Sequence, residues 1–220
     1  MSILKEKLVM VGFENKLILN EYIQIDQAND KIVLFFPGLH YNLENPLFYY
    51  LKQYYLDKNY DILQIDYHFK ERISEFQFDP DLLEQIVRFE SKVIFDKVIK
   101  LNKYSEIVIA GKSLGCAFMS GIFRIEHRFN RRRFLWLTPL LTHKEVSHLM
   151  LSCKDLSFLA IGDEDPFYDQ NVYEALKSKE NFKCLLINKA DHRLETKKKY
   201  FKSIEDLKNV IKNIDIFMSE

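Results

Sequence analysis

The chain has little glycine: six of its 220 residues, where an average usage of about 7% would give roughly fifteen. It also lacks repeats, low-complexity tracts and Pro- or Ser-rich linkers. These absences exclude flexible tethers between modules and indicate one domain over residues 1–220. They also make each glycine informative, because each is expected where the backbone needs it.

An excess of charge of either sign is absent as well. Thirty-two basic and thirty-two acidic residues give a formal net charge of +0. Because nucleic-acid binding requires a basic electrostatic footprint, we expect no nucleic-acid partner. The two short basic runs, Arg131–Arg133 and Lys197–Lys199, are interpreted as solvated faces, with a site for an anionic substrate or partner as the alternative.

Paired cysteines and long hydrophobic runs are also missing. Cys116, Cys153 and Cys184 are odd in number and have neither CxxC nor metal-ligand spacing, so we expect structural thiols in a reduced compartment and no metal. The opening segment MSILKEKLVM is interrupted by charged residues and has no signal-peptide core. No later run approaches the ~20 apolar residues of a membrane span. We therefore expect a cytoplasmic protein without a membrane partner.

Short apolar, β-branched runs alternate with longer segments of helical period along the chain. With 47% hydrophobic and 14% aromatic residues, the chain can bury a full core. The alternation is typical of α/β proteins in which helices cover both faces of a mostly parallel sheet. The predicted strands are Leu8–Phe13, Leu17–Gln24, Ile32–Phe36, Ile62–Asp66, Ile107–Ala110, Phe134–Leu137, Leu156–Ile161 and Cys184–Ile187.

The first two predicted strands are joined by the short segment Gly12–Asn15, which leaves no room for a crossover helix. They should therefore form an antiparallel hairpin at one edge of the sheet. Helices are predicted at Pro46–Lys58, at Pro80–Leu101 with Asp79 as N-cap, and at Leu114–Phe129, whose first half should be buried.

The segment G-K-S-L-G, Gly111–Gly115, fits two unrelated sites. A phosphate-binding P-loop needs a further glycine where this chain has Glu106, and it needs a flexible loop where this chain has a continuous strand. A nucleophile elbow needs a strand, a tight turn around a serine flanked by two glycines, and a helix; Ser113 meets these conditions. A helix N-cap is the remaining alternative for Ser113, but a cap does not require both glycines. The sequence therefore predicts a nucleophilic serine.

A serine hydroxyl is a weak nucleophile unless a base, itself oriented by a carboxylate, takes its proton. After an elbow of this kind the chain order is serine, acid, histidine. His192 is the histidine that follows the acidic loop I-G-D-E-D-P at Ile161–Pro166. Asp163 and Asp165 compete for the role of the acid, and Asp191 is a weaker candidate. A surface-loop histidine is the alternative interpretation of His192.

Negative charge that develops on a reacting carbonyl oxygen needs backbone N–H donors. Leu114, directly after the serine, is predicted to supply one of them. Leu39 is predicted to supply the other, because the strand Ile32–Phe36 ends in a sharp Pro37-Gly38 turn. Together these two amides would form an oxyanion hole.

Four motifs together resemble the α/β-hydrolase family over nearly the whole chain: F-P-G-L-H after the third strand, G-K-S-L-G, G-D-E-D-P and A-D-H-R-L. The resemblance implies an eight-stranded sheet and an ester-type hydrolase activity. In related esterases the acid commonly sits three residues after the loop glycine, which selects Asp165 over Asp163. The chain departs from the family at Pro37, where histidine is usual, and at Lys112, where aromatic, His or Asp residues are more frequent.

The resemblance also implies a small enzyme, because larger family members insert a lid domain after the strand that here ends at Leu137. The segment from Leu137 to Leu156 has room for only a turn and one short helix, so no cap domain is expected. The cleft should be shallow and open to water. Its predicted walls and substrate-binding residues are Gly38, Leu39, His40, Leu140 and Leu141, and His68 is a further pocket-wall candidate.

We therefore predict a serine hydrolase that cleaves a small carboxylic ester or thioester through an acyl-enzyme. Ser113, His192 and Asp165 form the predicted triad, and no cofactor is needed. A non-catalytic binding module with the same fold is the alternative from another class. A peptidase or acyltransferase would use the same triad.

Overall fold

An eight-stranded, mostly parallel sheet forms the centre of the protein. The computed structural model describes residues 3–26, 28–67, 79–101, 103–124 and 128–220. The strand order is β1-β2-β4-β3-β5-β6-β7-β8, in which β1 and β2 run antiparallel to their neighbours and the remaining pairs are parallel. The strands are β1 Leu4–Glu6, β2 Leu19–Gln24, β3 Lys31–Phe36, β4 Asp61–Asp66, β5 Glu106–Lys112, β6 Arg131–Leu137, β7 Leu156–Gly162 and β8 Phe182–Ile187.

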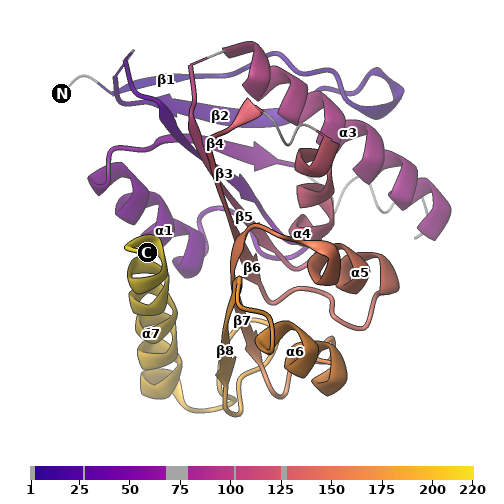
Figure 1. The fold of residues 1–220 in the computed structure, drawn as a ribbon, viewed down its shortest axis with the longest axis vertical. Coiled ribbons are helices and arrows are strands. Elements are labelled where there is room, and N and C mark those ends of the chain that lie inside the picture. Colours follow the sequence, from indigo (N-terminus) through magenta and orange to yellow (C-terminus); the bar gives the residue numbers. More distant parts are fainter. Residues whose placement is uncertain (1–2, 27, 68–78, 102, 125–127) are drawn as a thin grey trace.

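Helices cover both faces of the sheet, as the alternating sequence pattern predicted (Figure 1). On one face lie α1 (Pro46–Asp57) and α7 (Tyr200–Met218). On the other lie α3 (Pro80–Leu101), α4 (Gly115–Phe118), α5 (Lys144–Ser152) and α6 (Gln170–Lys177). The side chain of Asp79 accepts a hydrogen bond from the backbone N–H of Leu82 at 3.2 Å, which caps α3 as predicted.

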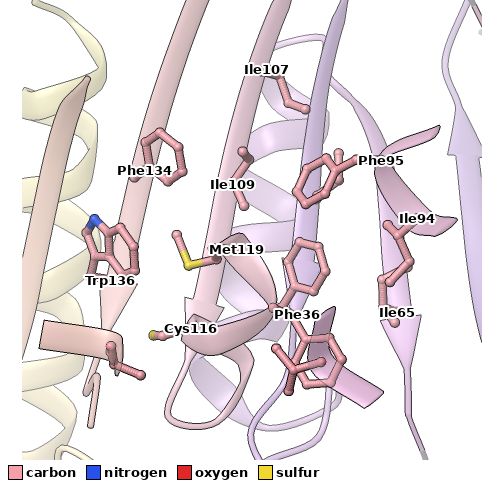
Figure 2. Packing of buried hydrophobic residues seen from close by; sticks show 14 of the residues in the cluster. Phe36, Ile65, Ile94, Phe95, Ile107, Ile109, Cys116, Met119, Phe134 and Trp136 are labelled. Carbon is pink, nitrogen blue, oxygen red and sulfur yellow. The ribbon is translucent and has the colours of Figure 1, made fainter. Parts of the chain in front are cut away.

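The core consists of two clusters, one on each face of the sheet. Because side chains alternate along a strand, Ile107 and Ile109 of β5 belong to the first cluster, and Val108 and Ala110 belong to the second. Figure 2 shows part of the first cluster, where Met119 lies among aromatic and β-branched side chains of the sheet and of α3. This packing holds the carboxyl ends of the central strands in fixed positions.

The first strand lies outside its predicted range. Strand β1 is Leu4–Glu6 and is exposed throughout, so hydrophobic periodicity could not identify it. Leu8 and Met10, which suggested a strand, are buried core residues, but Leu8 forms its backbone hydrogen bonds with the side chain of Asn20. An antiparallel pair does lie at the sheet edge, but it joins β1 to β2 and does not include the predicted strand Leu8–Phe13. The predicted bend holds a 3-10 turn, η1 (Phe13–Asn15), closed by an isolated antiparallel bridge between Val11 and Leu17.

The helix after the serine is shorter than predicted. It begins as α4 and continues as a 3-10 helix, η2 (Met119–Arg124), and part of its predicted end, residues 125–127, lies outside the described residues. Gly121 explains part of the change, because glycine has a low propensity for the α-helix. A larger residue would not fit here, since an added Cβ would lie 2.7 Å from Ser91 and Phe95 of α3. The buried first half was predicted correctly.

The interpretation of Arg131–Arg133 as a solvated face was wrong. These residues open β6, and Arg133 is buried with its Nη1 3.0 Å from Glu106 Oε1. Arg132 pairs with Asp155 at 2.8 Å. Strand register brings the arginines to acidic partners that are distant in sequence, whereas Lys197–Lys199 are exposed as predicted.

The segment between β6 and β7 is described completely and holds one helix, α5, so it carries no cap domain. Among the described residues, no helix has both the length and the apolar character that crossing a membrane requires. The three cysteines are free, and burial raises the pKa of Cys116 and Cys184 to about 12. His68 and His127 lie outside the described residues.

Candidate active site

Ser113 occupies a strained turn at the carboxyl end of β5. Its φ of 54° lies in the left-handed region, which a residue with a side chain adopts rarely. The turn packs tightly against the end of β3: a Cβ added at Gly115 would lie 2.0 Å from the carbonyl oxygen of Phe36. This close approach explains why residue 115 is glycine. The turn leaves the Ser113 side chain half-buried at the carboxyl ends of the central strands.

His192 lies beside Ser113, although 79 residues separate them in sequence. Its Nε2 is 2.8 Å from Ser113 Oγ. The loop that carries His192 connects β8 to α7 and is closed by a bridge between Ala190 and Thr196. Asp191 stabilises this loop from within, because its Oδ1 accepts the backbone N–H groups of Arg193 and Glu195.

Asp165 is the acidic residue that contacts His192. Its Oδ2 is 2.8 Å from His192 Nδ1, and its side chain is completely buried. Its other oxygen accepts the backbone N–H of Phe167 at 2.9 Å. Asp163, the competing candidate, instead accepts the backbone N–H of Lys189 at 2.5 Å. The structure therefore gives the two aspartates different partners.

The three side chains form one continuous hydrogen-bond path. A carboxylate has only acceptor oxygens, so Asp165 receives the Nδ1–H of His192, and Nε2 is left with the lone pair that faces Ser113. This arrangement can draw a proton from the serine hydroxyl and hold the resulting imidazolium beside a buried carboxylate.

The two predicted amide donors lie on loops that flank this serine. Strands β3 and β5 are parallel neighbours, with Phe36 opposite Gly111, so the loop after β3 reaches the turn after β5. A Cβ added at Gly38 would lie 3.1 Å from Ser113 Cβ, which locates the loop beside this serine. Within the described part of the chain, neither Leu39 nor Leu114 donates its backbone N–H to another protein group.

Lys112 is a member of the site that the sequence identified only as an unusual residue. It is 1% exposed, and its Nζ donates to Thr138 Oγ1 at 2.6 Å and to the backbone oxygen of His192 at 2.8 Å. It also lies over the ring of Tyr41, 4.6 Å from the centroid. Burial lowers the pKa of Lys112 to about 8. The sequence could have located Lys112, because strand alternation places it on the same face of β5 as the apolar residues Val108 and Ala110.

Phe167 is a second residue that sequence reasoning missed. Its ring packs edge-on against the His192 imidazole, with centroids 5.0 Å apart, and also contacts His143. No motif in the sequence marks this phenylalanine.

The predicted substrate-binding residues are less well defined. Leu140 and Leu141 are buried in the first core cluster at 8% and 1% exposure, Leu39 is half-buried and His40 is exposed. Their contact with a substrate stays a prediction.

Comparison with known proteins gives similarity in structure only. No protein-family model matches the chain, and no curated protein sequence is significantly similar to it. An α/β-hydrolase candidate of unknown function from Agrobacterium tumefaciens superposes with a TM-score of 0.71 at 14% identity, covering 97% of each chain. A dienelactone hydrolase-like promiscuous phosphotriesterase from metagenomic libraries gives 0.68 at 13% identity, covering 100% of this chain and 99% of the other. An esterase from Pyrococcus furiosus gives 0.64 at 14% identity, covering 94% and 91%. At these identities the similarity shows the fold.

Proposed function

We propose that this chain, which has the α/β-hydrolase fold, is a serine hydrolase that cleaves a small carboxylic ester or thioester. The observation that carries the proposal is the hydrogen-bond path from Ser113 through His192 to the buried Asp165, starting at a strained turn. Backbone strain and a buried carboxylate both cost stability, and such costs concentrate at functional sites.

The reaction begins when Ser113 Oγ attacks the acyl carbon and His192 Nε2 takes the hydroxyl proton. The amides of Leu39 and Leu114 receive the negative oxygen of the tetrahedral intermediate. His192 then gives its proton to the leaving oxygen or sulfur as the bond to the acyl carbon breaks, which leaves an ester on Ser113. Water attacks this ester with His192 as base, releasing the acid and restoring the serine hydroxyl.

A non-catalytic binding module remains the alternative from another class, and a peptidase or acyltransferase would use the same three residues. The absence of a cap between β6 and β7 favours a small acyl group over a long chain. Asp165 makes the triad complete, which favours turnover over binding alone.

The test is the reactivity of Ser113. Replacing Ser113→Ala should lower the hydrolysis of p-nitrophenyl acetate by about a million-fold, because triad residues act as a unit. Labelling by a fluorophosphonate should disappear in the same variant. Ser120→Ala, which removes another half-buried serine close by in the chain, is the control and should react normally. Undiminished turnover or labelling without the Ser113 hydroxyl would contradict the proposal.

A further inference from the structure

Lys112 is a buried charged residue on a strand face whose other members are apolar. Strand alternation places it on the face of β5 that also carries Val108 and Ala110, both completely buried in the second core cluster. Lysine is almost never fully buried unless its charge is paired. Its presence directly before the nucleophile therefore calls for an explanation in terms of its contacts.

Those contacts join three loops that come from three different strands. Thr138 follows β6, His192 follows β8, and Tyr41 belongs to the loop after β3 that also carries Leu39. Lys112 itself ends β5, directly before the turn that carries Ser113. One ammonium group therefore links this turn to the loop that carries His192 and to the loop that carries Leu39.

Thr138 provides a second, independent sign of function. It is completely buried and has a φ of 43°, which is unusual for a β-branched residue. Its backbone N–H is fixed to Ala160 at 2.7 Å, and its hydroxyl is turned to Lys112. Strain of this kind persists only where the surrounding structure imposes it.

The charges that surround Lys112 come from several elements. Asp165 from the loop after β7 favours the ammonium most, followed by Asp191 and Glu195 of the His192 loop. Cys116 of α4 also lies near Lys112 but is a neutral thiol, because burial raises its pKa to about 12. The carboxylates only partly offset burial, which is the largest effect and lowers the pKa of Lys112 to about 8. The ammonium is therefore the main form at neutral pH and is lost in mildly alkaline solution.

We propose that Lys112 is a positioning residue whose buried ammonium holds the His192 loop against the turn that carries Ser113, so that turnover requires this cation. The inference rests on the proposed function and adds a device that controls the same site. The neutral amine keeps two donors but loses the attraction to Asp165 and to the Tyr41 ring. The loop then shifts, and even a small displacement of a catalytic group costs rate.

The first test replaces Lys112→Met, which keeps the unbranched shape and most of the length of the side chain and removes the charge and both hydrogen bonds. We expect kcat for p-nitrophenyl acetate to fall by about 100-fold with little change in KM. Lys103→Met is the matched control. Lys103 also pairs with a buried carboxylate, that of Asp61, but this pair lies at the amino ends of the strands, away from Ser113. This control should keep kcat.

The second test is the pH dependence, which a merely structural lysine would not change. In the wild type, kcat should fall reversibly as pH rises through about 8. In Thr138→Val the same fall should occur at lower pH, because loss of an acceptor weakens the ammonium form. Thr138→Ser should restore the original profile. These variants keep Lys112, so they test the proposal even if Lys112→Met does not fold.

A third measurement is independent of turnover. The proton NMR signal of His192 Nδ1–H, shifted downfield by the bond to Asp165, should be present at neutral pH and lost above about pH 8, together with Ser113 labelling by fluorophosphonate. A wild type that labels at Ser113 but shows no alkaline loss of labelling and signal would overturn the role of Lys112 alone. A wild type in which Ser113 never labels would overturn the proposed function and, with it, the inference.

Discussion

At the scale of single residues, the role of a side chain depends on the hydrogen-bond partner beside which the backbone places it. Asp163 and Asp165 are two residues apart and have the same carboxylate, yet one accepts a backbone N–H of Lys189 and the other faces His192. The role of each therefore follows from the turn of the loop that carries them.

This difference gives a direct prediction for the acid. Asp165→Asn should lower kcat by about ten thousand-fold, because an amide holds His192 in the wrong tautomer and cannot stabilise its cation. Asp163→Asn is the control and should change kcat little. Hydrolysis of p-nitrophenyl acetate measures both, and equal losses in the two variants would contradict the assignment of Asp165.

Lys112 gives a prediction in which stability and activity move in opposite directions. Its pKa falls from 10.5 to about 8 on folding. Between these values the unfolded chain binds more protons than the folded one, so the free energy of unfolding rises with pH. Relative to Lys112→Met, the wild type should gain about 2 kcal/mol between roughly pH 7.5 and 9.5. Urea unfolding measures this difference, and a gain that fails to appear would show that Lys112 titrates elsewhere.

The sequence predicted the residues that carry recognisable spacing and missed those that depend on contacts. Ser113 is marked by its two glycines, and His192 by its place after an acidic loop. Lys112 could be identified as unusual, but its partners Thr138 and Tyr41 lie in the loops after β6 and β3, and only the sheet order brings them together.

At the scale of elements, the site depends on how closely the turn after β5 packs against β3. A Cβ at Gly115 would meet the backbone oxygen of Phe36 at 2.0 Å, whereas one at Gly121 would meet the side chain of Phe95 at 2.7 Å. Backbone of a central strand moves less readily than a side chain.

We therefore expect Gly115→Ala to lower the free energy of unfolding by about 3 kcal/mol or more, and Gly121→Ala by about 1–2 kcal/mol. Urea unfolding of the two variants compares them directly. Gly115→Ala should also remove Ser113 labelling under conditions where it remains folded. A milder effect at position 115 than at position 121 would mean that the elbow is more adaptable than its contacts indicate.

The elements themselves were predicted unevenly. Strands β3 to β8 lie near the predicted ranges because buried parallel strands read as short apolar runs. Strand β1 was misplaced because its residues are exposed, while Leu8 and Met10 are buried outside a strand. Arg133 was misinterpreted because its partner, Glu106, is set by strand register.

At the scale of the whole molecule, the lack of a cap between β6 and β7 gives a prediction for the size of the substrate. Each buried methylene of an acyl chain is worth about 0.8 kcal/mol, so a covered cleft rewards long chains and an open one does not. Activity on p-nitrophenyl esters should therefore peak at acetate or butyrate and fall by octanoate, without activation at a lipid interface. Rates that climb through decanoate, or that jump above the micellar concentration, would show that another segment covers the site.

The strand order also has a consequence for how the protein is made. From β6 onward, every strand pairs with the one before it in the chain, so each finds its neighbour already present as the ribosome extends the polypeptide. Ser113 is placed midway through this growth, whereas His192 follows the last strand. A nascent chain that already has its serine turn still lacks His192, so the proposed nucleophile should acquire its proposed base only when the sheet is complete.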